Sequence, residues 1–201
     1  MKKGTKTFTL IIFFAALIAL GSYFYVTNKA DNSQEVTTTS EKDILLNYDM
    51  AGNYPKTVRE AVKMHCRYLK YIYNEGLAKD FTEDDLFVMN QKMRQLYDDE
   101  LLEINQADQQ LKALNKEMEV YKAKKQKIVS YTLAEASQIE YNTDNGKEYA
   151  KMRVTIAMRI DGSSFSADEE YILRKDAEGK WKILGWQAIQ QDKANEEGDA
   201  K

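Results

Sequence analysis

The sequence predicts an α+β protein, in which an N-terminal transmembrane helix precedes about three helices packed on a four-stranded antiparallel sheet. Three observations lead to this fold class. An uncharged apolar run covers residues 8–26. Apolar residues recur at helical spacing over 57–121 and at every second position over 148–160. Because the helical and strand patterns occupy separate stretches of the chain, we expect the helices to cover one face of the sheet.

The apolar run at 8–26 predicts a membrane anchor. Its 19 residues are enough to cross a hydrocarbon core of about 30 Å as a helix. Three lysines within the first six residues precede the run, so the positive-inside rule places residues 1–7 in the cytoplasm and the C-terminal part outside. A cleaved signal peptide is the alternative, because Ala19-Leu20-Gly21 resembles a cleavage site, although the run continues apolar beyond it.

The remaining chain divides into a tether, a domain and a tail. Residues 27–42 are polar and lack aromatic side chains, which predicts a flexible tether. Residues 43–190 are predicted to form one extracytoplasmic α+β domain, and residues 191–201 a disordered tail. The predicted location is therefore the cell membrane, with a single pass.

The helical half begins with a clear start signal. Thr57 and Glu60 have the spacing of a capping box and open a predicted helix over 57–75. Thr82 opens the next helix. Its apolar stripe falters and then resumes, which predicts either two helices or one helix bent near Asn105.

The strand half predicts an antiparallel meander. Residues 148–160 alternate cleanly, with Lys151, Arg153 and Arg159 on the face opposite the apolar side chains. Short turns separate four predicted strands, which lie within 127–141, 148–160, 164–175 and 180–189. The predicted core consists of Met152, Val154, Ile156, Met158, Leu69, Ile72, Leu86, Met93, Trp181 and Ile183.

Composition argues against several kinds of chemistry. The chain carries a net charge of −3 even with its basic N-terminus, so the domain is a poor ligand for nucleic acid. Cys66 is the single cysteine and His65 the single histidine, which leaves no intrachain disulfide and no zinc ligand set. No cofactor is predicted. The charge runs at 98–100 and 122–127 are interpreted as solvated helix faces.

The order of elements and the last strand carry a resemblance to known proteins. The closing segment, Lys180-Trp181-Lys182-Ile183-Leu184-Gly185-Trp186, resembles the final strand of the nuclear-transport-factor-2-like, or SnoaL-like, superfamily. This resemblance implies a cone in which helices cover a curved sheet. The stretch 53–63, together with the anchor, also resembles a family of uncharacterised anchored proteins of Gram-positive, clostridia-like bacteria. The superfamily includes both enzymes and binding modules, so the fold does not decide the function.

Five residues are candidates for lining a pocket in the domain. His65 lies in the apolar stripe of its helix and should point inward, either as an acid–base group or as a hydrogen-bonded core histidine. Glu169 alternates with apolar residues and would be a buried carboxylate if that face is inward. Aromatic side chains on the strands can line a concave sheet, and the candidates are Tyr131, Tyr171 and Trp181. No residue is assigned a catalytic or metal-binding role.

These observations predict a membrane-anchored, non-catalytic module that binds an unknown protein or small molecule. A scaffold in an envelope or secretion assembly is one alternative, and a pocket-based isomerase or dehydratase is another. The polar outer face of the sheet favours a monomeric domain. Leu184 and Trp186 are predicted on that outer face, opposite Trp181 and Ile183, where an apolar patch would instead favour a dimer.

Overall fold

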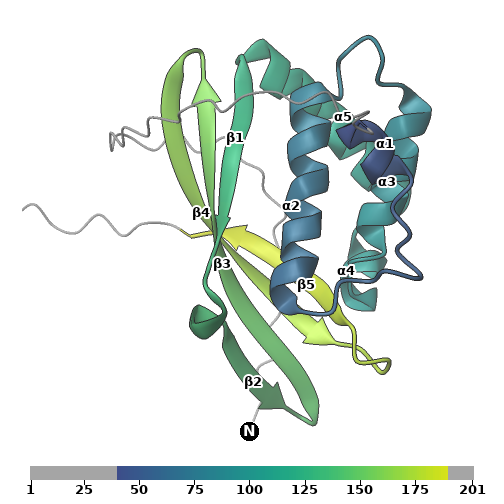
Figure 1. Ribbon diagram of the computed structural model, residues 1–201, viewed down its shortest axis with the longest axis vertical. Helices are drawn as coiled ribbons and strands as arrows, with labels where there is room; N and C mark the ends of the chain where they lie inside the picture. Colours follow the sequence, from purple (N-terminus) through teal and green to yellow (C-terminus); the bar gives the residue numbers. More distant parts are fainter. Residues whose placement is uncertain (1–39, 190–201) are drawn as a thin grey trace, which may run out of the picture.

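The computed structural model describes residues 40–189, which form helices packed on one face of a curved antiparallel sheet (Figure 1). The helices are α1 (Glu41–Leu46), α2 (Val58–Glu75), α3 (Glu83–Arg94), α4 (Asp99–Ile104), α5 (Ala107–Ala123) and the short 3-10 helix η1 (Ala136–Gln138). The strands are β1 (Gln126–Leu133), β2 (Glu140–Asp144), β3 (Lys147–Ile160), β4 (Ser163–Lys175) and β5 (Trp181–Ala188). The predicted α+β class is confirmed, with more elements than expected.

The sheet runs in the order β1-β3-β4-β5. β3 is long enough to pair with β1 along its second half and with β2 along its first half. The predicted first strand is thus two strands separated by η1. Asn145 and Gly146 both have positive φ in the turn between β2 and β3, which suits a two-residue hairpin.

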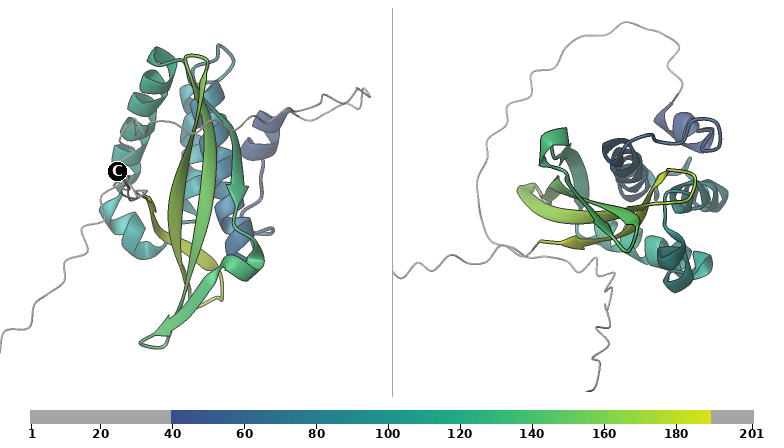
Figure 2. Two further views of the ribbon diagram at one scale, coloured as in Figure 1. Left: turned by 90° about the vertical axis from the view of Figure 1, so that its left-hand side faces the viewer. Right: turned by 90° about the horizontal axis from the view of Figure 1, so that it is seen from below.

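Helix α2 is the centre of the helical layer. It contacts β1, β3 and β5 on one side and α1, α3 and α5 on the others, and Figure 2 shows it packed between the sheet and the remaining helices, with one side uncovered. The predicted capping box is present, since Thr57 Oγ1 accepts from the Glu60 amide at 3.1 Å and Glu60 Oε2 accepts from the Thr57 amide at 3.1 Å. The capping box therefore sets the residue at which α2 begins.

The predicted core is confirmed in nearly every position. All of its members are buried except Met158, which is half-buried near one end of the sheet. The predicted outer face is also confirmed, because Lys151, Arg153 and Arg159 are exposed. On that face the ammonium of Lys151 lies 3.7 Å from the carboxylate of Glu170.

Two features of the segment after α3 differ from the predictions. An extra helix, α4, precedes the break near Asn105, so the chain forms two further helices there. Asp98 is buried and not part of a solvated face: it caps α4 by accepting from the Glu100 amide, and it accepts from Arg174 Nε at 2.9 Å. A buried carboxylate needs such partners, and a charge count along the chain does not reveal them.

A bulge in β5 overturns the predicted outer-face position of Trp186. Ile172 pairs with Gly185 but Leu173 pairs with Ile183, so one extra residue, Leu184, lies between them. The bulge shifts the alternation by one position. Trp186 therefore points to the same inner face as Ile183, and the apolar patch proposed for dimerisation is not formed there.

The membrane predictions concern residues outside the described part. The predicted anchor at 8–26 and tail at 191–201 lie outside residues 40–189. No helix between residues 40 and 189 has the length and apolar character of a membrane span. The predicted tether at 27–42 is too long at its C-terminal end, because α1 already begins at Glu41, with Ser40 as its N-cap.

Candidate functional site

The inward direction predicted for His65 is confirmed. Its side chain is completely buried and touches two tyrosine hydroxyls, with Nδ1 3.1 Å from Tyr171 Oη and Nε2 3.0 Å from Tyr97 Oη. The ring of Trp186 packs on the imidazole with centroids 4.6 Å apart and stacks on Tyr171. Residues from α2, the segment after α3, β4 and β5 thus meet in one cluster, the His65 cluster.

The hydrogen bonds of this cluster have a defined direction. Arg94 can only donate, and its Nη1 lies 2.8 Å from Gln110 Oε1. The Gln110 amide nitrogen therefore faces Tyr97 and donates to its oxygen at 3.0 Å. The Tyr97 hydroxyl is then free to donate to His65 Nε2, which leaves the proton of the neutral ring on Nδ1 to donate to Tyr171.

This environment does not suit His65 as an acid or base. Burial lowers the pKa of His65 to about 3, because a charged imidazole would lose its hydration with no carboxylate beside it. The ring is neutral at neutral pH, and both nitrogens already have partners. The arrangement is that of the hydrogen-bonded core histidine weighed in the sequence analysis.

Glu169 lies beyond Tyr171 and not beside His65. Its side chain is buried on the inner face, and Oε2 has no hydrogen-bond partner within residues 40–189. Burial raises the pKa of Glu169 to about 7, an effect that a hydrogen bond from Tyr171 partly offsets. Burial also raises the pKa of the Cys66 thiol to about 12, so that thiol is not an activated nucleophile.

Trp181 and Tyr131, the remaining candidates, lie apart from the His65 cluster. Trp181 packs against Tyr141 with ring centroids 5.7 Å apart, and the ammonium of Lys175 lies 5.3 Å from its ring. Tyr131 points from β1 towards α2. The five candidates predicted for one pocket therefore occupy three different places.

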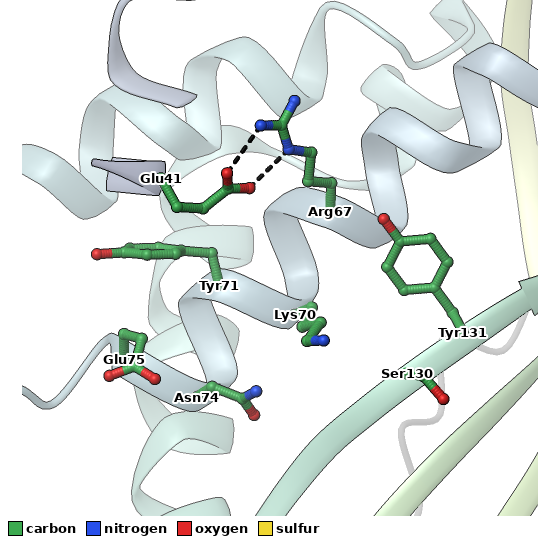
Figure 3. A pocket seen from close by; sticks show the side chains of 8 residues that line it. All are labelled: Glu41, Arg67, Lys70, Tyr71, Asn74, Glu75, Ser130 and Tyr131. Atoms are coloured by element: carbon green, nitrogen blue, oxygen red, sulfur yellow. Dashed lines mark hydrogen bonds and ion pairs between the residues drawn. The ribbon is translucent and has the colours of Figure 1, made fainter. Parts of the chain in front are cut away.

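Tyr131 lines an open groove between α1, α2 and β1 (Figure 3). The groove has a volume of about 650 Å³, within the range of small-ligand sites. Its lining consists of Glu41, Arg67, Lys70, Tyr71, Asn74, Glu75, Ser130 and Tyr131. We call this site the α2–β1 groove.

The comparison with protein families matches nearly the whole chain. A family model described as a domain of unknown function (DUF6715) covers residues 1–186. The chain belongs to the DUF6715 family. No curated protein matches the sequence.

The DUF6715 match spans the predicted anchor, the His65 cluster and the α2–β1 groove. The family description assigns no ligand, so only the side chains that line each site indicate what it could bind. Within residues 40–189 no group of three or more histidine, cysteine or acidic side chains is placed to hold a metal ion.

Most residues of the groove were not predicted from the sequence. Arg67, Lys70 and Tyr71 lie on the side of α2 that faces away from its apolar stripe, where charged residues are usually solvated. One signal was available: residues 67, 70, 71, 74 and 75 are all polar or aromatic and recur at helical spacing.

Proposed function

We propose that this protein is a membrane-anchored, extracytoplasmic binding module that takes its ligand in the α2–β1 groove. The observation that carries the proposal is the groove itself. It is open to solvent, it is lined by charged and aromatic side chains, and it has the volume of a ligand site.

The His65 cluster supports binding over catalysis. An enzyme of the predicted isomerase or dehydratase kind would need His65 and a carboxylate facing one accessible pocket. Here Tyr171 lies between His65 and Glu169, and the imidazole has no exposed surface. A structural role fits the cluster better, because its contacts hold α2 against β4 and β5. The groove lies on the outward side of the same helix.

The predicted anchor would hold this groove near the membrane. The apolar run at 8–26 and the lysines before it support this part of the proposal. Glu41, which lines the groove, is the first residue of α1 and lies at the C-terminal end of the predicted tether. A ligand in the groove would thus be held close to the point where the domain joins its anchor.

Photo-crosslinking in living cells tests the proposal. A photoreactive p-benzoylphenylalanine is placed at Ser130 in the groove of the full chain, and at Arg159 on the exposed outer face of β3 as the matched control. Irradiation should give an adduct of defined mass at position 130 and none at 159. Equal labelling at both positions, or none at position 130, would show that the groove is not the binding site.

A further inference from the structure

A bulge in β1 builds the floor of the α2–β1 groove. Ile128 pairs with Met158 and Ser130 pairs with Ala157, so Val129 is an extra residue. The bulge leaves the Val129 carbonyl outside the strand ladder, and Lys70 Nζ donates to it at 2.6 Å. The bulge also turns Tyr131 to the same face as Ile128, which brings its ring to the groove.

Two of the four charges in the groove neutralise each other. Arg67 donates from Nε and Nη2 to the two carboxylate oxygens of Glu41, at 2.6 and 2.8 Å. This bidentate pair fixes one end of the groove and leaves little charge for a ligand.

The other two charges, Lys70 and Glu75, have no counter-charge in the part of the chain that the structure describes. The Lys70 ammonium is held by a neutral carbonyl, with two of its three N–H donors left over. Within residues 40–189 the Glu75 carboxylate has no ion-pair partner. Figure 3 shows Lys70 directed towards the β1 side, while Glu75 lies with Tyr71 on the other side. Among residues 40–189, the groove thus presents one cation and one anion without an ion-pair partner, and the two side chains leave α2 towards different sides.

We infer that the α2–β1 groove binds a short zwitterionic peptide, with its terminal carboxylate at Lys70 and its terminal ammonium at Glu75. The inference rests on the proposed function. Tyr71 and Tyr131, both half-buried, supply ring surface for the peptide's side chains. The opposite charges of Lys70 and Glu75 also select against ligands that carry only one kind of charge.

The spacing of the charges favours a peptide over a single amino acid. Lys70 and Glu75 are five residues apart on α2, which is about 7.5 Å along the helix axis and about 140° around it, so their charged ends lie farther apart than the axial rise alone. An extended dipeptide spans about 7 Å, whereas one residue spans about 3.5 Å. A free amino acid is therefore too short to pair with both charges, and a dipeptide is the shortest peptide that can do so.

Titration calorimetry of the full chain in mild detergent tests the ligand class. The probes are alanyl-alanine, its N-acetylated form, its C-terminal amide and free alanine. Alanyl-alanine should bind. Each of the other three probes should bind with an affinity at least roughly tenfold lower, since each loses a charge-assisted contact.

Substitutions test which side chain binds each terminus of the peptide. Glu75→Gln should abolish the difference between the free and acetylated amines, and Lys70→Met the difference between the free carboxylate and the amide. Lys63→Met, on an exposed position of the same helix, should change neither. Thermal melts of all variants check the fold.

The outcomes separate this inference from the proposed function. Equal binding of all four probes, or binding of none, overturns the zwitterion inference. If the Ser130 crosslink still forms in cells, the groove remains a binding site for a ligand of another class. If that crosslink is also absent, both proposals fail.

Discussion

Glu169 should make the stability of the domain fall as the pH rises through neutrality. Its carboxyl has an ordinary pKa of 4.5 in the unfolded chain and a pKa of about 7 in the fold. Below pH 4.5 it is protonated in both states and burial costs no charge. Between pH 4.5 and 7 the unfolded state has lost the proton and the folded state keeps it, so each pH unit favours unfolding.

The size of the effect follows from that difference. One pKa unit corresponds to about 1.4 kcal/mol, so the loss approaches about 3 kcal/mol by pH 7 and then levels off. That is a large part of the stability of an ordinary domain. Cys66 and Tyr171 do not titrate in this range, because burial raises the pKa of both. His65 contributes with the opposite sign: its pKa is 6.5 in the unfolded chain and about 3 in the fold, so its contribution to stability rises with pH up to about 6.5 and offsets that of Glu169 there. Glu117 also has a raised pKa, so its contribution has the same sign and must be subtracted.

Urea unfolding from pH 5 to 8 measures the effect. Trp186 stacks on Tyr171, so tryptophan fluorescence reports directly on the region around Glu169. The comparison is between the parent chain, Glu169→Gln, which removes the titration but keeps the shape, and Glu148→Gln on an exposed position as control. The stability of the parent should fall by about 2–3 kcal/mol relative to that of Glu169→Gln between pH 5 and pH 8, because the His65 contribution is common to both and cancels in the difference. The control should run parallel to the parent. If the parent and Glu169→Gln have parallel profiles, Glu169 is not a buried, unpaired carboxyl and the assignment is wrong.

Three further substitutions test the packing of the inner face by urea unfolding. His65→Leu should cost about 3 kcal/mol, because it removes one hydrogen-bond partner from each of two buried tyrosine hydroxyls; combining it with Tyr171→Phe should cost less than the sum of the two, and strict additivity would contradict a shared network. Ile156→Ala should cost about 2–5 kcal/mol, whereas Arg159→Ala on the same strand should stay within about 0.5 kcal/mol; equal costs would mean that the faces of β3 are misassigned. Trp186→Ala should cost about 3 kcal/mol without changing the mass seen by light scattering, and dissociation of a dimer would instead support the outer-face position.

The sequence predicted what depends on local pattern. The capping box of Thr57 and Glu60 marked the start of α2 within one residue. Strict alternation marked both faces of β3. These signals work because caps and strand faces are set by residues a few positions apart.

What the sequence did not predict depends on contacts between distant residues. Asp98 looked like a solvated charge until Arg174, 76 positions away, was seen beside it. His65 was correctly directed inward, but its partners Tyr97 and Tyr171 come from other elements, 32 and 106 positions along the chain. No periodicity within α2 carries information about such partners.

The two bulges explain why the candidate site moved from the interior to the surface. In an unbroken alternation Ile128 and Tyr131 would point to opposite faces, as would Ile183 and Trp186. One extra residue in each strand reverses that. In β5 the shift sends Trp186 inward, where its ring packs on His65 and completes the cluster. In β1 the shift brings Tyr131 to α2 and frees the Val129 carbonyl that holds Lys70. The same irregularity thus encloses the histidine at one strand and builds a charged, open groove at the other, so the accessible chemistry of this domain lies along the outward side of α2.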